Sequence, residues 1–143
     1  MLTKAGGKMR LALITATIIL GVSMAGQAKD NGKAVNVERL LDAIAQVESG
    51  SRADAVGDSG NAVGILQIWP IMVKDVNRIS GKDFTLKDRC NKQKSYEMCR
   101  IYLNHYCKGM SDFNKSRCWN GGCYGHKKKA TIPYAKKVMK AMK

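Results

Sequence analysis

The strongest candidate for chemistry in the sequence is a single carboxyl group, that of Glu48, which falls where a helix should be apolar. Leu41, Ile44 and Val47 recur at the spacing of one helical face. At about 100° per residue, Glu48 falls about 20° from Leu41 and about 40° from Ile44 around that helix. We therefore predict that the Glu48 side chain lies in the apolar stripe and not on the wet face.

Two effects are expected to raise the pKa of the Glu48 carboxyl. Burial among apolar side chains disfavours the charged form. Gly50 is expected to end the helix, so Glu48 lies in its last turn, where the helix dipole disfavours a second negative charge. A carboxyl that keeps its proton near neutral pH suits a general acid. The alternative is that the helix ends one turn earlier and leaves Glu48 exposed.

The elements that must position this carboxyl are predicted to be helices joined by long loops. Helices are expected from Val37 to a stop at Gly50, from Pro70 to a stop at Gly81, over 96–106, over 112–119, and after a Thr131 cap. Asn36 is the expected cap of the first helix, and one helical turn is expected near 86–90. No stretch shows sustained period-two alternation, so we predict a mainly α fold, a small helical domain with long loops.

Residues 1–28 have the pattern of an export signal. Three cations precede the apolar run Leu11–Leu20, and small residues follow, with cleavage expected after Gly26-Gln27-Ala28 or, alternatively, after Ser23-Met24-Ala25. The apolar run is shorter than the about 20 residues of a membrane span. An uncleaved anchor over 11–28 is the alternative, and both interpretations place the rest of the chain outside the cytoplasm, in the periplasm or the extracellular space.

The remainder is predicted to be a mobile lead-in, residues 29–36, and one globular domain, residues 37–143. The 143 residues include 25 Lys or Arg and 11 Asp or Glu, a net charge of +14. Three of these cations and no acid belong to residues 1–28, so the exported part keeps 22 cations, 11 acids and a charge of +11. Such an excess indicates an anionic partner.

The densest cationic cluster lies near the C-terminus. It consists of Lys127, Lys128, Lys129, Lys136, Lys137, Lys140 and Lys143. It is interpreted either as a surface for anionic envelope polymers or as a solubilising face. Nucleic acid is not expected as the partner of an exported chain without a nucleic-acid-binding motif.

Five cysteines lie in the second half of the chain: Cys90, Cys99, Cys107, Cys118 and Cys123. In an oxidising compartment they predict two disulfides and one odd thiol. Cys99 and Cys107 cannot pair if they share one helix, because they would lie about 12 Å apart. A zinc site that adds His105 or His126 is not favoured, because no paired C-x-x-C spacing is present. We predict no metal and no cofactor.

Four short stretches occur in a distinctive order. They are Val47-Glu48-Ser49-Gly50, Gly64-Ile65-Leu66-Gln67, Trp119-Asn120-Gly121-Gly122 and Thr131-Ile132-Pro133-Tyr134. An E-S motif, a G-x-x-Q motif, an aromatic-Asn-x-Gly motif and a T-x-x-Y motif in this order resemble the lysozyme-like superfamily of soluble lytic transglycosylases and goose-type lysozymes. The resemblance covers residues 37–138 and implies a lysozyme-like helical domain.

The resemblance implies a role for each matching residue. Glu48 would be the sole catalytic acid, and the Ser49 hydroxyl would contact the N-acetyl group of the substrate. Gly64 would let the backbone come close, and Gln67 would line the sugar cleft. From the residue alone, the alternative is that Gln67, in an apolar run, satisfies buried backbone groups.

The C-terminal motifs complete the implied site. Asn120, with Trp119 before it, matches the motif that holds the glutamate and the sugar, and the Tyr134 hydroxyl would reach toward Glu48. From pattern alone, Trp119 and Tyr134 could instead be core aromatics. Where relatives often have Pro after this W-N-G-G run, the chain has Cys123, and a Cys118–Cys123 bridge would brace the loop.

The resemblance implies a lytic transglycosylase that cleaves the β-1,4 bond between N-acetylmuramic acid and N-acetylglucosamine in peptidoglycan and leaves a 1,6-anhydro end. Ordinary glycosidases need two carboxyl groups that flank the glycosidic bond to be cleaved. In this sequence, Glu48 is the only acid that belongs to one of the four motifs. Hydrolysis on the same fold, with Asp54 or Asp58 positioning water, is the first alternative. The second is a non-catalytic, secreted cationic protein that binds the envelope through its last helix.

Overall fold

The computed structural model describes residues 27–143, so most of the predicted export signal lies outside the described residues. The fold is mainly α, as predicted. The described residues form five α-helices: α1 (Gln27–Ser49), α2 (Pro70–Ser80), α3 (Lys92–Tyr106), α4 (Asp112–Gly121) and α5 (Ile132–Ala141). Four 3-10 turns accompany them: η1 (Asp58–Gly60), η2 (Leu86–Cys90), η3 (Gly125–Lys127) and η4 (Lys129–Thr131). Within residues 27–143, no helix combines the length and apolar composition needed to cross a membrane.

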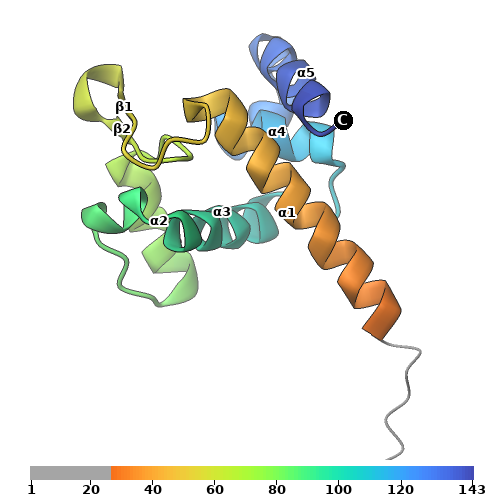
Figure 1. Cartoon of the computed structure of the whole chain (residues 1–143), viewed down its shortest axis with the longest axis horizontal. Coiled ribbons are helices and arrows are strands. Elements are labelled where there is room, and N and C mark those ends of the chain that lie inside the picture. The colour runs from red at the N-terminus through yellow and green to blue at the C-terminus, as the bar shows by residue number, and fades with distance from the viewer. Residues whose placement is uncertain (1–26) are drawn as a thin grey trace, which may run out of the picture.

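Helix α1 is the long diagonal rod of Figure 1, with α2 and α3 on one side and α4 and α5 on the other. It begins at Gln27, so residues 29–36 are helical and Asn36 does not cap it. The cap prediction was wrong because Lys33 and Ala34, shortly before Asn36, are good helix formers and carry the helix past it, although Asp30, Asn31 and Gly32 further back are poor ones. The Asn36 amide instead donates to Asp112 at the start of α4, at 3.1 Å.

The apolar stripe of α1 forms the centre of the core. Leu41 and Ile44 have no exposed surface, and they belong to one cluster with Met98 of α3 and Val138 of α5. The predicted helix stops are confirmed. Gly50 and Gly81 end α1 and α2 with φ of +61° and +68°, the left-handed region that glycine enters without a Cβ penalty.

A small hairpin follows α1. Strands β1 (Val56–Gly57) and β2 (Ala62–Val63) pair antiparallel within the stretch predicted as loop. Two residues each are too few for a period-two pattern to show in the sequence. The chain then folds back, and Val63 and Ile68 exchange backbone hydrogen bonds of 3.3 and 2.9 Å.

Arg89 fastens this hairpin region to η2. The residue is only 8% exposed, and its guanidinium donates to the carbonyls of Leu86, Asn61 and Ile68 at 2.9 to 3.0 Å. Buried charges are tolerated when they are fully hydrogen-bonded. The turn of helix expected near 86–90 is therefore confirmed, and it serves to hold the segment that leads into α2.

Helices α3 and α4 start from side-chain caps. Asn91 accepts from the Lys94 amide at 3.0 Å, and Ser111 accepts from the Asn114 amide at 3.4 Å. α3 therefore begins four residues before the predicted Tyr96. Thr131 occupies the cap position of α5, but its hydroxyl lies 2.7 Å from the carbonyls of Gly125 and Lys128 behind it.

Candidate active site

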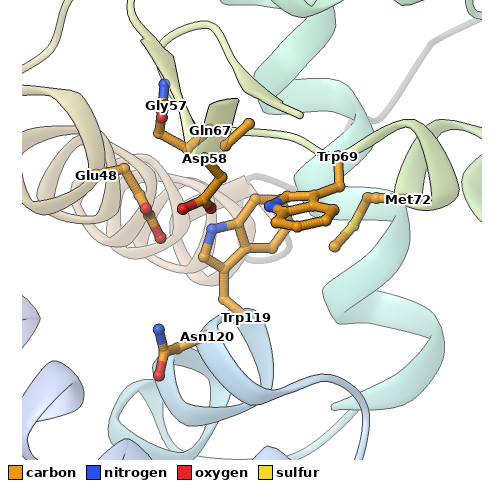
Figure 2. A pocket seen from close by; sticks show the side chains of 9 residues that line it. Glu48, Gly57, Asp58, Gln67, Trp69, Met72, Trp119 and Asn120 are labelled. Atoms are coloured by element: carbon orange, nitrogen blue, oxygen red, sulfur yellow. The ribbon is translucent and has the colours of Figure 1, made fainter. Parts of the chain in front are cut away.

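A cleft of about 500 Å³ opens where the end of α1, the hairpin, the start of α2 and the end of α4 meet. It is lined by Glu48, Gly57, Asp58, Ala62, Gln67, Trp69, Met72, Trp119 and Asn120. Figure 2 shows the carboxyl groups of Glu48 and Asp58 and the indole of Trp119 turned toward the same space. Residues from the stretch 48–72 and from the distant end of α4 thus meet around one predicted acid.

Glu48 reaches this cleft because α1 stops directly after it. The amides of Gly50 and Ser51 return to the carbonyls of Gln46 and Ala45, at 3.1 Å each, and close the last turn. The Tyr134 hydroxyl, from the first turn of α5, donates to Glu48 Oε1 at 2.7 Å. A half-buried carboxyl is therefore held in one orientation between the core and the cleft.

The surroundings of Glu48 raise the pKa of its carboxyl above the ordinary value. Burial is the largest cause, since it penalises the charged form, and the negative charge of Asp58 acts in the same direction. The hydrogen-bonding side chains of Tyr134 and Trp119 oppose these effects and lower the pKa. Burial also raises the pKa of the Tyr134 phenol, and the Glu48 charge beside it adds to the shift. The phenol therefore keeps its proton as a donor.

Three of the expected site residues do not line the cleft: Tyr134 contacts Glu48 from behind it, and Ser49 and Gly64 have other partners. The Ser49 hydroxyl donates to the Ile65 carbonyl at 2.8 Å and accepts from the Arg52 amide at 3.1 Å, so it ties α1 to the next segment. Gly64 has φ of +85°, and a Cβ there would collide with the Arg89 carbonyl oxygen. The close approach that requires this glycine is therefore to protein backbone.

Gln67 lies in the cleft and also braces it. Its side-chain nitrogen donates to the carbonyls of Ala55 and Gly64 at 3.2 and 3.0 Å, while its backbone has φ of +49°. A Cβ at Gly57 would collide with the Gln67 side-chain oxygen. Both interpretations of Gln67 hold, since one amide satisfies backbone carbonyls and lines the cleft.

The end of α4 supplies the opposite wall. Trp119 is 7% exposed and meets the ring of Tyr102 edge-on at a centroid distance of 6.0 Å. Asn120 follows it and lines the cleft from an exposed position. Trp119 is thus both a core aromatic and a cleft residue.

Sequence reasoning did not assign the start of α2 to the site. Trp69 is 44% exposed and lines the cleft with Met72 one turn later. The sequence held one signal, because Trp69 lies only two residues after Gln67 of the G-x-x-Q stretch. Of the two acids considered as a second carboxylate, Asp58 lines the cleft while the exposed Asp54 does not.

The predicted disulfides are not formed. All five cysteines are free thiols, and the Cys118 sulfur lies 3.6 Å from the carbonyl oxygen of Cys123 and 3.4 Å from His126 Nδ1. The turn at Gly122 presents the backbone of Cys123 to Cys118, which explains why the expected bridge is absent. Among the described residues, no three His, Cys, Asp or Glu side chains are arranged to hold a metal ion.

A helical domain with one shielded glutamate at a helix end, facing an open cleft, defines the lysozyme-like class. Residues 26–139 match the model of the transglycosylase SLT domain, and the chain belongs to this family. The family carries peptidoglycan activity of the lytic transglycosylase type. No curated protein matches the chain.

Proposed function

We propose that this protein is a lytic transglycosylase that cleaves the β-1,4 bond between N-acetylmuramic acid and N-acetylglucosamine, with Glu48 as both general acid and general base. One observation carries the proposal. Glu48 is the carboxyl that faces the cleft with a raised pKa and a fixed orientation, 2.7 Å from the Tyr134 hydroxyl. Shielding and orientation are the two requirements of a general acid at neutral pH.

The reaction uses the Glu48 proton twice. The protonated carboxyl first gives its proton to the glycosidic oxygen, and the bond from that oxygen to C1 of the muramoyl residue breaks. The N-acetyl group of the same sugar supports the positive charge at C1. The muramoyl 6-hydroxyl then attacks C1 while Glu48 removes its proton, which restores the acid and leaves a 1,6-anhydro end. No water is consumed, so one well-placed carboxyl suffices.

Tyr134 acts through Glu48 in this scheme. Its hydroxyl donates to Oε1, so it stabilises the carboxylate that forms after the first proton transfer. Gln67, Trp69, Trp119 and Asn120 offer amide and ring surfaces for the glycan. Ser49 and Gly64 serve the scaffold and have no substrate role in this proposal.

Hydrolysis is the second candidate, and one observation favours it. Asp58 lines the same cleft, and its charge contributes to the raised pKa of Glu48. In this alternative, Asp58 positions a water that attacks C1 from the cleft. The product would then carry a reducing end in place of the anhydro ring.

Purified peptidoglycan digested by the wild type, Glu48→Gln and Asp58→Asn distinguishes these cases. We expect wild-type products lighter by one water than reducing muropeptides, as measured by mass spectrometry. Glu48→Gln should lose about 10²- to 10⁴-fold in rate, while Asp58→Asn should still form anhydro ends. Asp54→Asn, an exposed acid outside the cleft, is the matched control.

Three results would count against the proposal. Reducing ends from the wild type that disappear in Asp58→Asn would establish hydrolysis. Equal clearing of a cell-wall suspension by Glu48→Gln and the wild type would remove the assignment of Glu48. If neither the wild type nor Glu48→Gln cleared the cell-wall suspension, the protein would be a non-catalytic binding protein.

We also propose that the protein is exported, since peptidoglycan lies outside the cytoplasm and residues 1–28 have the pattern of an export signal. Mass spectrometry of the chain recovered from the producing cell tests this. A mature N-terminus at Lys29 or Gly26 supports cleavage, and an intact N-terminus in the membrane fraction supports an anchor.

A further inference from the structure

The C-terminal part of the chain is charged in one sign only. Residues 113–143 contain nine Lys or Arg and no Asp or Glu. Seven of these cations are exposed lysines on α5, on the turns that precede it and at the chain end. We call these seven the C-terminal basic surface: Lys127, Lys128, Lys129, Lys136, Lys137, Lys140 and Lys143.

This surface is not neutralised by the protein itself. Six salt bridges join described side chains, and all six use cations elsewhere, such as Arg78 with Asp75 and Arg100 with Glu38. Lys128 donates to the Gly121 carbonyl at 2.7 Å, and the Lys127 ammonium lies over the Tyr124 ring. Both contacts keep the positive charge. A concentration of like charge repels itself and attracts polyanions.

The apolar side of α5 is already used by the fold. Ala135 and Val138 have no exposed surface, and Tyr134 is turned to Glu48. Figure 1 shows α5 lying beside α4 on the outside of the molecule. Of the large apolar side chains that are exposed in the described chain, Tyr124 alone lies near the basic surface. Insertion into a bilayer needs an apolar helix face, so these charges suit a partner in water.

The lysines also indicate the kind of partner. The ammonium group of lysine is a compact, hydrated point charge. It lacks the planar donor geometry with which the guanidinium of arginine binds one anionic group in a fixed orientation. Seven ammonium groups spread over exposed surface suit a chain with repeated anionic groups. Lysine binds phosphate well as a point charge, and releasing the counterions of a polyanion supplies the affinity.

We propose that the C-terminal basic surface binds a flexible envelope polymer with repeated phosphate groups. The surface begins beside the cleft, because Lys128 contacts the carbonyl of Gly121, the residue after Asn120 of the cleft wall. A polymer bound along α5 holds the enzyme at the wall and leaves the cleft free for glycan. The binding does not depend on the reaction proposed for Glu48.

The test compares two triple variants of equal net charge. Lys136→Gln, Lys137→Gln and Lys140→Gln remove three cations from the basic surface. Lys74→Gln, Lys87→Gln and Lys108→Gln remove three exposed, unbridged lysines elsewhere in the described chain. Binding to linear inorganic polyphosphate is measured by titration calorimetry at several salt concentrations, with thermal melting to verify folding.

We expect the α5 triple variant to bind polyphosphate about tenfold or more weakly at low salt, and its log affinity to fall less steeply with log salt, by about 2. The control triple should change the Kd by less than about twofold. Glu48→Gln should bind like the wild type, which separates this proposal from the catalytic one. Equal losses in both triples, no polyphosphate binding by the wild type, or binding only to vesicles of anionic lipid would overturn the proposal.

Discussion

At the scale of single residues, the behaviour of the site depends on which neighbours favour the charged form of Glu48. Burial and the Asp58 charge raise the pKa of its carboxyl, while the hydrogen-bonding side chains of Tyr134 and Trp119 lower it. The net direction is upward. In the reaction proposed above, the acid loses its proton as pH rises through this pKa, and the first step stops. The alkaline limb of the pH–rate profile therefore reports the pKa of Glu48 in the free enzyme.

Two conservative substitutions should move this limb in opposite directions. Tyr134→Phe removes a donor that favours the carboxylate, so the pKa of Glu48 rises and the limb moves to higher pH. Asp58→Asn removes a neighbouring negative charge, so the pKa falls and the limb moves to lower pH. Tyr134→Phe should also lower kcat by about tenfold, the value of a hydrogen bond to a charged group. The measurement is kcat/KM for a soluble glycan from acid to alkaline pH.

Asp54→Asn serves as the control for these profiles, because Asp54 is an exposed acid that does not line the cleft. Its profile should coincide with that of the wild type. If the alkaline limbs of Tyr134→Phe and Asp58→Asn moved in the same direction, the two neighbours would not act on Glu48 as described.

At the scale of elements, the cleft depends on one backbone contact between segments about 25 residues apart. Gly64 lies against the Arg89 carbonyl, and the Arg89 guanidinium returns to the Asn61 and Ile68 carbonyls at 3.0 Å. This contact helps to set the position of Gln67 and Trp69, which lie three and five residues after Gly64. η2 therefore shapes the site without contributing a residue to it.

Gly64→Ala should be destabilising beyond the cost of a left-handed alanine. The matched control is Gly81→Ala, which has a similar positive φ of +68° and no atom within 4 Å of the added Cβ. The control should cost about 1–2 kcal/mol for its backbone conformation. Gly64→Ala should cost about 1–3 kcal/mol more, because the added methyl group overpacks the contact. Urea unfolding measures the free energy of unfolding of both variants. An equal decrease in the two would show that the structure around the Arg89 carbonyl accommodates the added methyl group without a loss of stability.

The sequence predicted those parts of the fold that local signals determine. The stripe of Leu41 and Ile44 and the glycine stops were recoverable, since periodicity and positive φ leave marks in single segments. Glu48, Gln67 and Tyr134 were predicted as site residues through their motifs; Glu48 and Gln67 line the cleft, and Tyr134 contacts Glu48. The actual partners of Ser49 and Gly64 were not recoverable, because they lie on segments brought near by tertiary packing. The start of α1 was misplaced because a good capping residue does not stop a helix that favourable residues carry past it.

At the scale of the whole molecule, packing sorts the five thiols by reactivity. Cys90 is exposed, Cys123 is half-buried, and Cys99, Cys107 and Cys118 have no exposed surface. Burial raises the pKa of Cys99 well above its usual range. Burial and the adjacent Cys118 thiol raise the pKa of Cys107 to about 12. Since the thiolate is the reactive form, the core thiols are doubly protected.

The reduced native protein should therefore show one fast thiol, that of Cys90, toward an aromatic disulfide reagent. Cys123 should follow more slowly, and the other three should react only on unfolding. Absorbance of the released thiolate gives the stoichiometry of each phase. Cys90→Ser should delete the fast phase and leave the rest unchanged. Three or more fast thiols in the native protein would contradict the packing of α3 against α4.

The indole of Trp119 has one more consequence, because the same ring borders the cleft and meets Tyr102 inside the core at 6.0 Å. On this side, the depth of the cleft is thus determined by interior packing and not by a movable rim. A sugar entering it meets a surface that cannot recede unless the interior itself rearranges. Heat that loosens the interior must therefore deform the cleft at the same temperature, so catalysis and global structure should be lost together.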